Sequence, residues 1–131
     1  AQETLEEADV YGGGDYFASA RLTRQQARDS AISLLQEAAA QEGADQSVAD
    51  EASLGIQTLA SYTLAEAQIE NLVTAKGYAD CVAFMGEESI SIVVSKDDGS
   101  DLTAEDVAKI TDIAITETGY DASGIKIVPA N

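Results

Sequence analysis

Apolar periodicity between residues 78 and 128 constrains the fold more than any other feature of the sequence. Residues 78–85 form a short apolar run, and residues 90–95 alternate before becoming β-branched, which is typical of strands. Residues 103–118 repeat apolar side chains at the helical period, and residues 125–128 read as a last short strand. The order strand, strand, helix, strand predicts a compact module that combines a sheet with helices.

The connections between these segments predict the topology of the sheet. Gly86-Glu87-Glu88 turns the first two strands into an antiparallel hairpin, and a right-handed helical crossover makes the second and third strands parallel. We therefore expect a three-stranded mixed sheet in the order first, second, third. Ile90, Ile92 and Val94 share one face of the second strand while serines occupy the other, so we expect helices on one face only.

Two helices are expected ahead of this module. Asp15 caps a first helix that runs from residue 16 to about residue 42 and stops at Gly43. A second helix starts at Asp45 or Ser47 and runs to residue 76, where Gly77 supplies the left-handed end. The fold class is thus α+β, with two N-terminal helices followed by a β-β-α-β module.

Three segments are expected along the chain. Residues 1–14 are acidic and glycine-rich, which is typical of a flexible linker and also of a frayed terminus. Residues 15–45 hold the N-terminal helix, and residues 46–131 form the α-β-β-α-β domain.

Charge excludes several classes of partner. The chain has 24 acidic and 7 basic residues, no histidine and a formal net charge of −17 at pH 7. Nucleic acids and anionic lipids both require a basic face, so neither is expected as a partner. Without histidine the chain lacks the commonest general base and metal ligand.

No catalytic, cofactor or metal site is predicted. Cys81 has no basic neighbour in sequence to activate it, so it reads as a small apolar strand residue. The acidic loop at residues 96–101 lacks the ligand spacing of an EF-hand and reads as a solvated turn. A glycosidase would need two carboxylates in a cleft, and here the acids fall in loops, caps and polar helix faces.

Protein-binding surfaces are the remaining candidates. Exposed sheet edges are templates for pairing with another chain, although Asp80, Glu87 and the net charge could instead protect the first edge. A second candidate is a cluster of arginines on one face of the first helix, which either pairs with carboxylates of this chain or contacts a partner. The candidate interface residues are Cys81, Ala83, Met85, Ile125, Lys126, Ile127, Arg21, Arg24 and Arg28.

Three short segments carry a family resemblance in their order and spacing. They are Asp15-Tyr16-Phe17 ahead of the three arginines, Ala75-Lys76-Gly77-Tyr78 before the first strand, and Glu117-Thr118-Gly119 before Ile125-Lys126-Ile127-Val128-Pro129. With them, residues 15–129 resemble the extracytoplasmic region of the stage III sporulation protein AH family. That domain is similar to the ring-building motif of type III secretion and flagellar basal-body proteins.

The resemblance implies a non-enzymatic assembly role. Members of the family carry one transmembrane helix upstream and belong to a channel-like complex between mother cell and forespore. They bind the extracytoplasmic domain of stage II sporulation protein Q, and the fold implies a place in a multi-subunit ring. The net charge of −17 opposes packing beside copies of the same chain. The alternative is a ring-building subunit of a secretion or flagellar-type apparatus not linked to sporulation.

Overall fold

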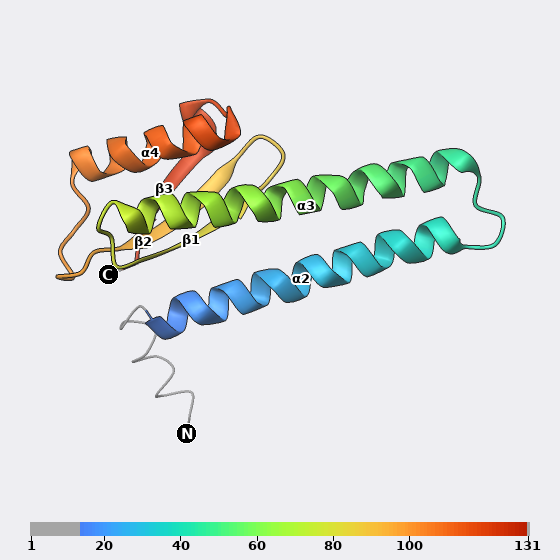
Figure 1. Cartoon of the computed structure of the whole chain (residues 1–131), viewed down its shortest axis with the longest axis horizontal. Helices are drawn as coiled ribbons and strands as arrows, with labels where there is room; N and C mark the ends of the chain where they lie inside the picture. Colours follow the sequence, from blue (N-terminus) through green and yellow to red (C-terminus); the bar gives the residue numbers. More distant parts are fainter. Residues whose placement is uncertain (1–13, 131) are drawn as a thin grey trace, which may run out of the picture.

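A computed structural model describes residues 14–130, so nearly all of the predicted linker lies outside the described residues. Two long helices lead into a small sheet, over which a third helix crosses (Figure 1). In chain order the elements are α2 (Gly14–Ala40), α3 (Gln46–Ala75), β1 (Asp80–Met85), β2 (Ile90–Ser95), α4 (Ala104–Thr118), the 3-10 helix η1 (Ala122–Gly124) and β3 (Ile125–Pro129).

Helices α2 and α3 form an antiparallel hairpin that projects well past the sheet (Figure 1). The predicted helices are confirmed, but α2 begins at Gly14, so Asp15 lies inside the helix and not before it. Asp45 is the N-cap of α3, and its side chain accepts a hydrogen bond from the Val48 amide. The division of the chain at residue 45 into two units stays a prediction.

The sheet has the predicted order β1-β2-β3. Strands β1 and β2 are antiparallel, with Cys81 opposite Val94, and strands β2 and β3 are parallel, with Ile92 opposite Ile127. The tight turn after β1 and the right-handed crossover through α4 were sufficient to predict this topology, because each connection follows a rule that depends on few residues.

The main core lies between one face of the sheet and the helices α3 and α4. Helix α3 lies over β1 and helix α4 over β3. Apolar side chains at alternate strand positions meet one stripe from each helix. The buried members of this core are Ile69, Val73, Tyr78, Cys81, Ala83, Ile90, Ile92, Val94, Ile110 and Ala114.

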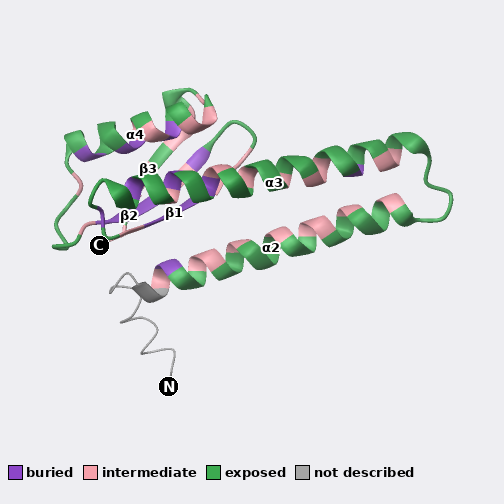
Figure 2. Cartoon of the chain, viewed as in Figure 1, coloured by how far each residue is buried: buried purple, intermediate pink, exposed green. Residues whose placement is uncertain are grey.

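A second, smaller core lies on the other face of the sheet. Phe17 in the first turns of α2 is fully buried against Val82 and Val93. The other residues between positions 16 and 40 are exposed or half-buried, and Figure 2 shows most of α2 in those two colours. The expectation of helices on one face holds for α3 and α4. Helix α2 adds partial cover on the second face, because Val82 and Val93 need an apolar partner there.

Asp106 fastens the start of α4 to the rest of the module. Thr103 and Asp106 form a capping box, and Asp106 also accepts hydrogen bonds from Tyr78 at 2.7 Å and Lys96 at 2.9 Å. The bond from the Thr103 backbone, followed by those from Tyr78 and Lys96, holds the pKa of Asp106 well below its usual range.

We expect Asp106→Asn to lower the urea midpoint of unfolding at pH 7. Because the folded-state pKa is depressed, the stability that Asp106 contributes is present above the unfolded pKa of about 3.9 and is lost as pH falls below it. Urea titrations at pH 7 and near pH 3 should therefore show that the difference in unfolding midpoint between wild type and variant is smaller at the lower pH. Asp112→Asn, at an exposed position of the same helix, is the control; an unchanged gap would contradict the assignment.

Candidate protein-binding edges of the sheet

The outer edge of β1 is closed by side chains of this chain. Alternate residues of β1 point their backbone groups away from β2, and each outward amide finds a carboxylate. The Ala83 amide donates to Glu70 at 2.8 Å, and the Met85 amide donates to Glu66 at 2.7 Å. The Cys81 amide donates to the side chain of Asp80 at 2.8 Å.

Two outward carbonyls of the same edge accept hydrogen bonds from arginines of α2. Arg21 donates to the Cys81 carbonyl at 2.6 Å, and Arg24 donates to the Ala83 carbonyl. Side chains from α2 and α3 thus occupy the place that a neighbouring strand would take. The expectation that both edges of the sheet are open is therefore wrong at β1.

The same arginines form a network of ion pairs between α2, α3 and β1. Arg28 makes two hydrogen bonds to Glu66, at 2.9 and 2.8 Å, and the Glu66 side chain is fully buried. The remaining pairs within the network are Arg24–Glu66 at 3.4 Å, Arg24–Glu70 at 2.7 Å, Arg21–Glu70 at 3.7 Å and Arg21–Asp80 at 2.6 Å. Of the two alternatives for the arginines, the structure thus shows pairing with carboxylates of this chain.

Spacing explains why α2 presents arginines to its neighbours. Phe17, Arg21, Arg24 and Arg28 are separated by four, three and four residues, which places them on one helical stripe. That stripe faces α3 and β1, while Leu34 farther along the helix is 66% exposed. Sequence reasoning left open whether the arginines pair within the chain or contact a partner, and it missed the buried Glu66. The signal was Glu66 and Glu70 at the matching spacing on α3.

The remaining ionisable groups of the interior are inert or paired. Burial, with the nearby Glu70 carboxylate adding to it, raises the pKa of the Cys81 thiol to about 12, so this thiol stays protonated at neutral pH. The buried carboxylates in the described part of the chain, Glu66 and Asp106, pair with arginine and lysine. Within residues 14–130 no group of three potential metal ligands comes together.

The outer edge of β3 differs from that of β1. The Ala130 amide donates to the Val94 carbonyl at 3.0 Å. The backbone N–H and C=O groups of Lys126 and Val128, at alternate positions, therefore also point toward β2, and those of Ile127 point away from it. The Ile125 amide donates a hydrogen bond to the Ala122 carbonyl of η1. Across residues 14–130, no side chain hydrogen bond goes to the backbone of Ile127, in contrast to Ala83 on β1.

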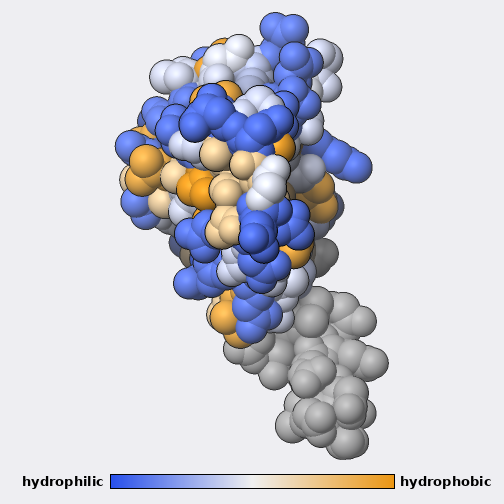
Figure 3. Space-filling model, turned by 90° about the vertical axis from the view of Figure 1, so that its right-hand side faces the viewer, coloured by the Kyte–Doolittle hydropathy of each residue, from blue (hydrophilic) through white to orange (hydrophobic). Residues whose placement is uncertain are grey.

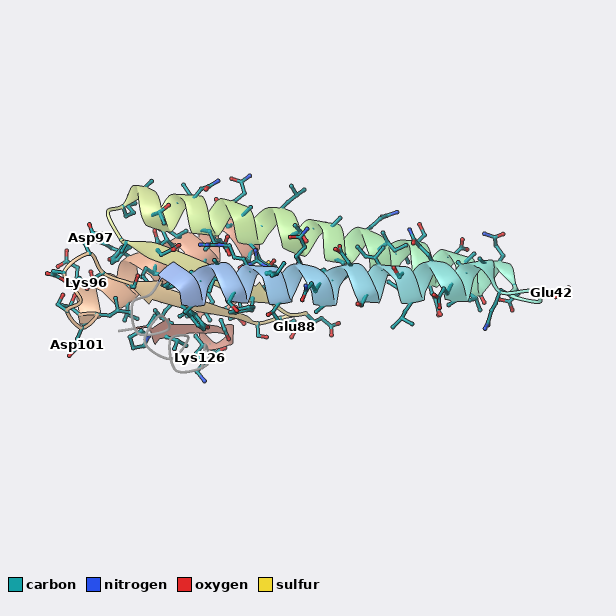
Figure 4. All side chains as sticks on the ribbon, turned by 90° about the horizontal axis from the view of Figure 1, so that it is seen from below. Glu42, Glu88, Lys96, Asp97, Asp101 and Lys126 are labelled. Carbon is teal, nitrogen blue, oxygen red and sulfur yellow. The ribbon has the colours of Figure 1, made fainter. Side chains whose placement is uncertain are left out.

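Lys126 marks the side of the sheet that is remote from the hairpin. Its side chain is exposed and lies away from α2 and α3 (Figure 4). Within residues 14–130 it forms no ion pair. Pro129 has no amide hydrogen and ends the strand, as expected of an edge.

Two grooves follow the seam between α2 and α3. The larger, of about 670 Å³, is lined by the three arginines together with Asp29, Ile32 and Leu64 among others. The smaller, of about 380 Å³, lies near the end of the hairpin between alanines of both helices. Figure 3 looks at this end, where apolar side chains reach the surface between hydrophilic ones. Neither groove is lined by a pair of carboxylates.

Among the helices within residues 14–130, none is both long enough and apolar enough to cross a membrane.

Comparisons with known proteins agree with this architecture. A chain of the SpoIIQ-SpoIIIAH pore forming complex matches with a TM-score of 0.70 and 21% identity, covering 87% of this chain and 97% of that one. The type III secretion system protein EscJ of enteropathogenic E. coli matches with a TM-score of 0.51 and 21% identity, covering 57% of this chain and 49% of that one. Both likenesses confirm the predicted α+β fold class.

A comparison with functionally curated proteins gave no significant match. The family model described as SpoIIIAH-like protein matches residues 1–127, which is nearly the whole chain. The chain therefore belongs to the SpoIIIAH-like protein family.

Proposed function

We propose that this chain is a non-enzymatic assembly module that binds a stage II sporulation protein Q-like domain through the outer edge of β3. Membership of the SpoIIIAH-like family supports this, as does a fold shared with a chain of the SpoIIQ-SpoIIIAH complex. The observation that carries the proposal is the contrast between the two edges of the sheet. Side chains close β1, while within residues 14–130 no side chain bonds to the outward backbone of Ile127.

An open strand edge binds a partner by adding that partner's strand to the sheet. Ile127 offers an amide and a carbonyl, and the carbonyls of Ile125 and Pro129 flank them on the same side. Ile125, Lys126 and Ile127 are thus the proposed interface residues. Cys81, Ala83 and Met85 already have their outward amides bonded within the chain.

Closure of β1 limits how copies of this chain meet. Strand β3 of one copy cannot extend its sheet onto β1 of the next while the arginines and glutamates occupy that edge. The net charge of −17 adds repulsion between copies. We propose that any ring is held by contacts other than sheet extension and forms with the partner present.

We propose an extracytoplasmic location, with the domain held in the mother-cell membrane by a helix upstream of it and facing the space between mother cell and forespore. The domain would then form half of a bridge to a partner from the opposite membrane. Family membership supports this topology.

The likeness to EscJ favours a second candidate function. A ring-building subunit of a secretion or flagellar-type apparatus, unconnected with sporulation, would use the same fold. In that case the partner would come from that apparatus and not from the sporulation protein Q family.

Titration calorimetry against the protein Q-like domain of the same organism tests the proposal. We expect micromolar or tighter binding by a partner and weaker self-association of the isolated chain. In the complex, amide exchange should slow at Ile127 and stay unchanged at Ala83 and Met85, which are already bonded. Absence of binding heat at tens of micromolar would count against this partner. Slower amide exchange on β1 with no change on β3 would count against the β3 edge as the binding surface.

A further inference from the structure

The two flanks of α4 have different neighbours. Lys109 lines a pocket of about 290 Å³ together with Lys76 and Tyr78, which lie at and just beyond the end of α3. This flank of α4 therefore faces α3. Because α3 covers β1 and α4 covers β3, the opposite flank of α4 lies toward the outer edge of β3.

That opposite flank carries exposed apolar side chains. Val107, Thr111 and Ile115 are spaced by four residues on α4 and so share one stripe, about 200° around the helix from Lys109. Val107 is 38% exposed and Ile115 is 37% exposed. A strand added beside β3 would extend the sheet beneath this stripe and cover it.

Lys126 lies on the other face of the same edge. Ile125 and Ile127 contact the main core, and the intervening Lys126 points to the opposite side of the sheet. Its neighbour in register on β2 is the uncharged Ser91. Five of the seven basic residues form ion pairs, and within residues 14–130 the two that do not are Lys76 and Lys126.

We propose that the β3 edge accepts an extended partner segment with apolar side chains toward Val107 and Ile115 and a carboxylate opposite Lys126. This inference rests on the proposed function and specifies the chemistry of the partner. Charge complementarity selects the occupant, because an unpaired lysine beside an added strand favours an acidic residue across from it. A second copy is disfavoured by the closed β1 edge and by the net charge of −17.

Binding of the protein Q-like domain to four variants and two controls tests this chemistry. We expect Lys126→Glu to weaken binding by about tenfold or more, and Val107→Ser and Ile115→Ser to weaken it by about three- to tenfold each. Val107→Ser combined with Ile115→Ser should weaken it further. The controls are Lys76→Glu, at the other basic residue without an ion pair, and Leu34→Ser, at a residue 66% exposed on the hairpin; both should stay within about twofold.

Thermal unfolding of each variant separates loss of binding from loss of fold, and Lys126→Glu at an exposed position should unfold as wild type does. Wild-type binding that survives all four variants would overturn this inference and leave the proposed function standing. Failure of the wild-type chain to bind would overturn both. Weakening by Leu34→Ser alone would move the interface to the hairpin, and weakening by Lys76→Glu alone would move it to the end of α3.

Discussion

Glu66→Ala should lower the free energy of unfolding by about 3–5 kcal/mol, because it removes one partner from a buried ion pair. Glu66 is fully buried in α3, and its carboxylate accepts two hydrogen bonds from Arg28 and one from the Met85 amide. Without it, the Arg28 guanidinium loses its carboxylate and keeps only its hydrogen bond to Thr63, while the outward Met85 amide of β1 loses its acceptor. Urea unfolding monitored by circular dichroism measures the change.

Two further variants bracket the role of Glu66. Glu51→Ala removes an exposed carboxylate from the same helix and should change the free energy of unfolding by less than about 0.5 kcal/mol. Glu66→Gln keeps an oxygen for the Met85 amide and loses the charge facing Arg28, so its loss should fall between the two. A Glu66→Ala variant as stable as Glu51→Ala would show that the buried pair contributes nothing to stability.

Phe17→Ala should lower the free energy of unfolding by about 3–5 kcal/mol, the range for truncating a buried phenylalanine. Phe17 is fully buried between α2 and the second face of the sheet, where it contacts Val82 and Val93. It is also the apolar anchor that holds the start of α2, and hence Arg21 four residues later, beside β1. The variant should therefore unfold at lower urea and also increase amide exchange at Cys81.

The matched control is Leu22→Ala on the same helix, at a side chain that is 54% exposed. Its free energy of unfolding should change by less than about 1 kcal/mol, since little apolar surface returns to water. Equal losses for Phe17→Ala and Leu22→Ala would mean that α2 is not anchored at Phe17.

Glu66→Ala and Phe17→Ala both test how α2 is held beside α3 and β1. Helix α2 packs along α3, and side chains from both helices take the place of a fourth strand beside β1. Proteins often protect edge strands with charged side chains or a covering helix, and here two helices provide the charged side chains. Within residues 14–130, the backbone of Ile127 on β3 has no such side-chain protection, in contrast to Ala83 on β1.

The sequence alone determined the three strands, the helices α2, α3 and α4, and the order of the strands, but it did not indicate the 3-10 helix η1. Apolar periods separated strands from helices, and Asp45 or Ser47 marked the start of α3. These signals are local, because a cap, a turn or a helical stripe depends on residues a few positions apart. Family membership could be anticipated for the same reason, since its short segments keep their order along the chain.

Only the tertiary structure decided that side chains of this chain close the outer edge of β1. The bonds from α2 that close β1 join Arg24 to Ala83 across 59 positions and Arg21 to Cys81 across 60. From sequence, an arginine facing solvent and one facing a strand edge look alike, because both sit at polar positions of a helix. The difference arises when α2 folds back along α3 and excludes water, which makes each unpaired charge costly and each pair specific.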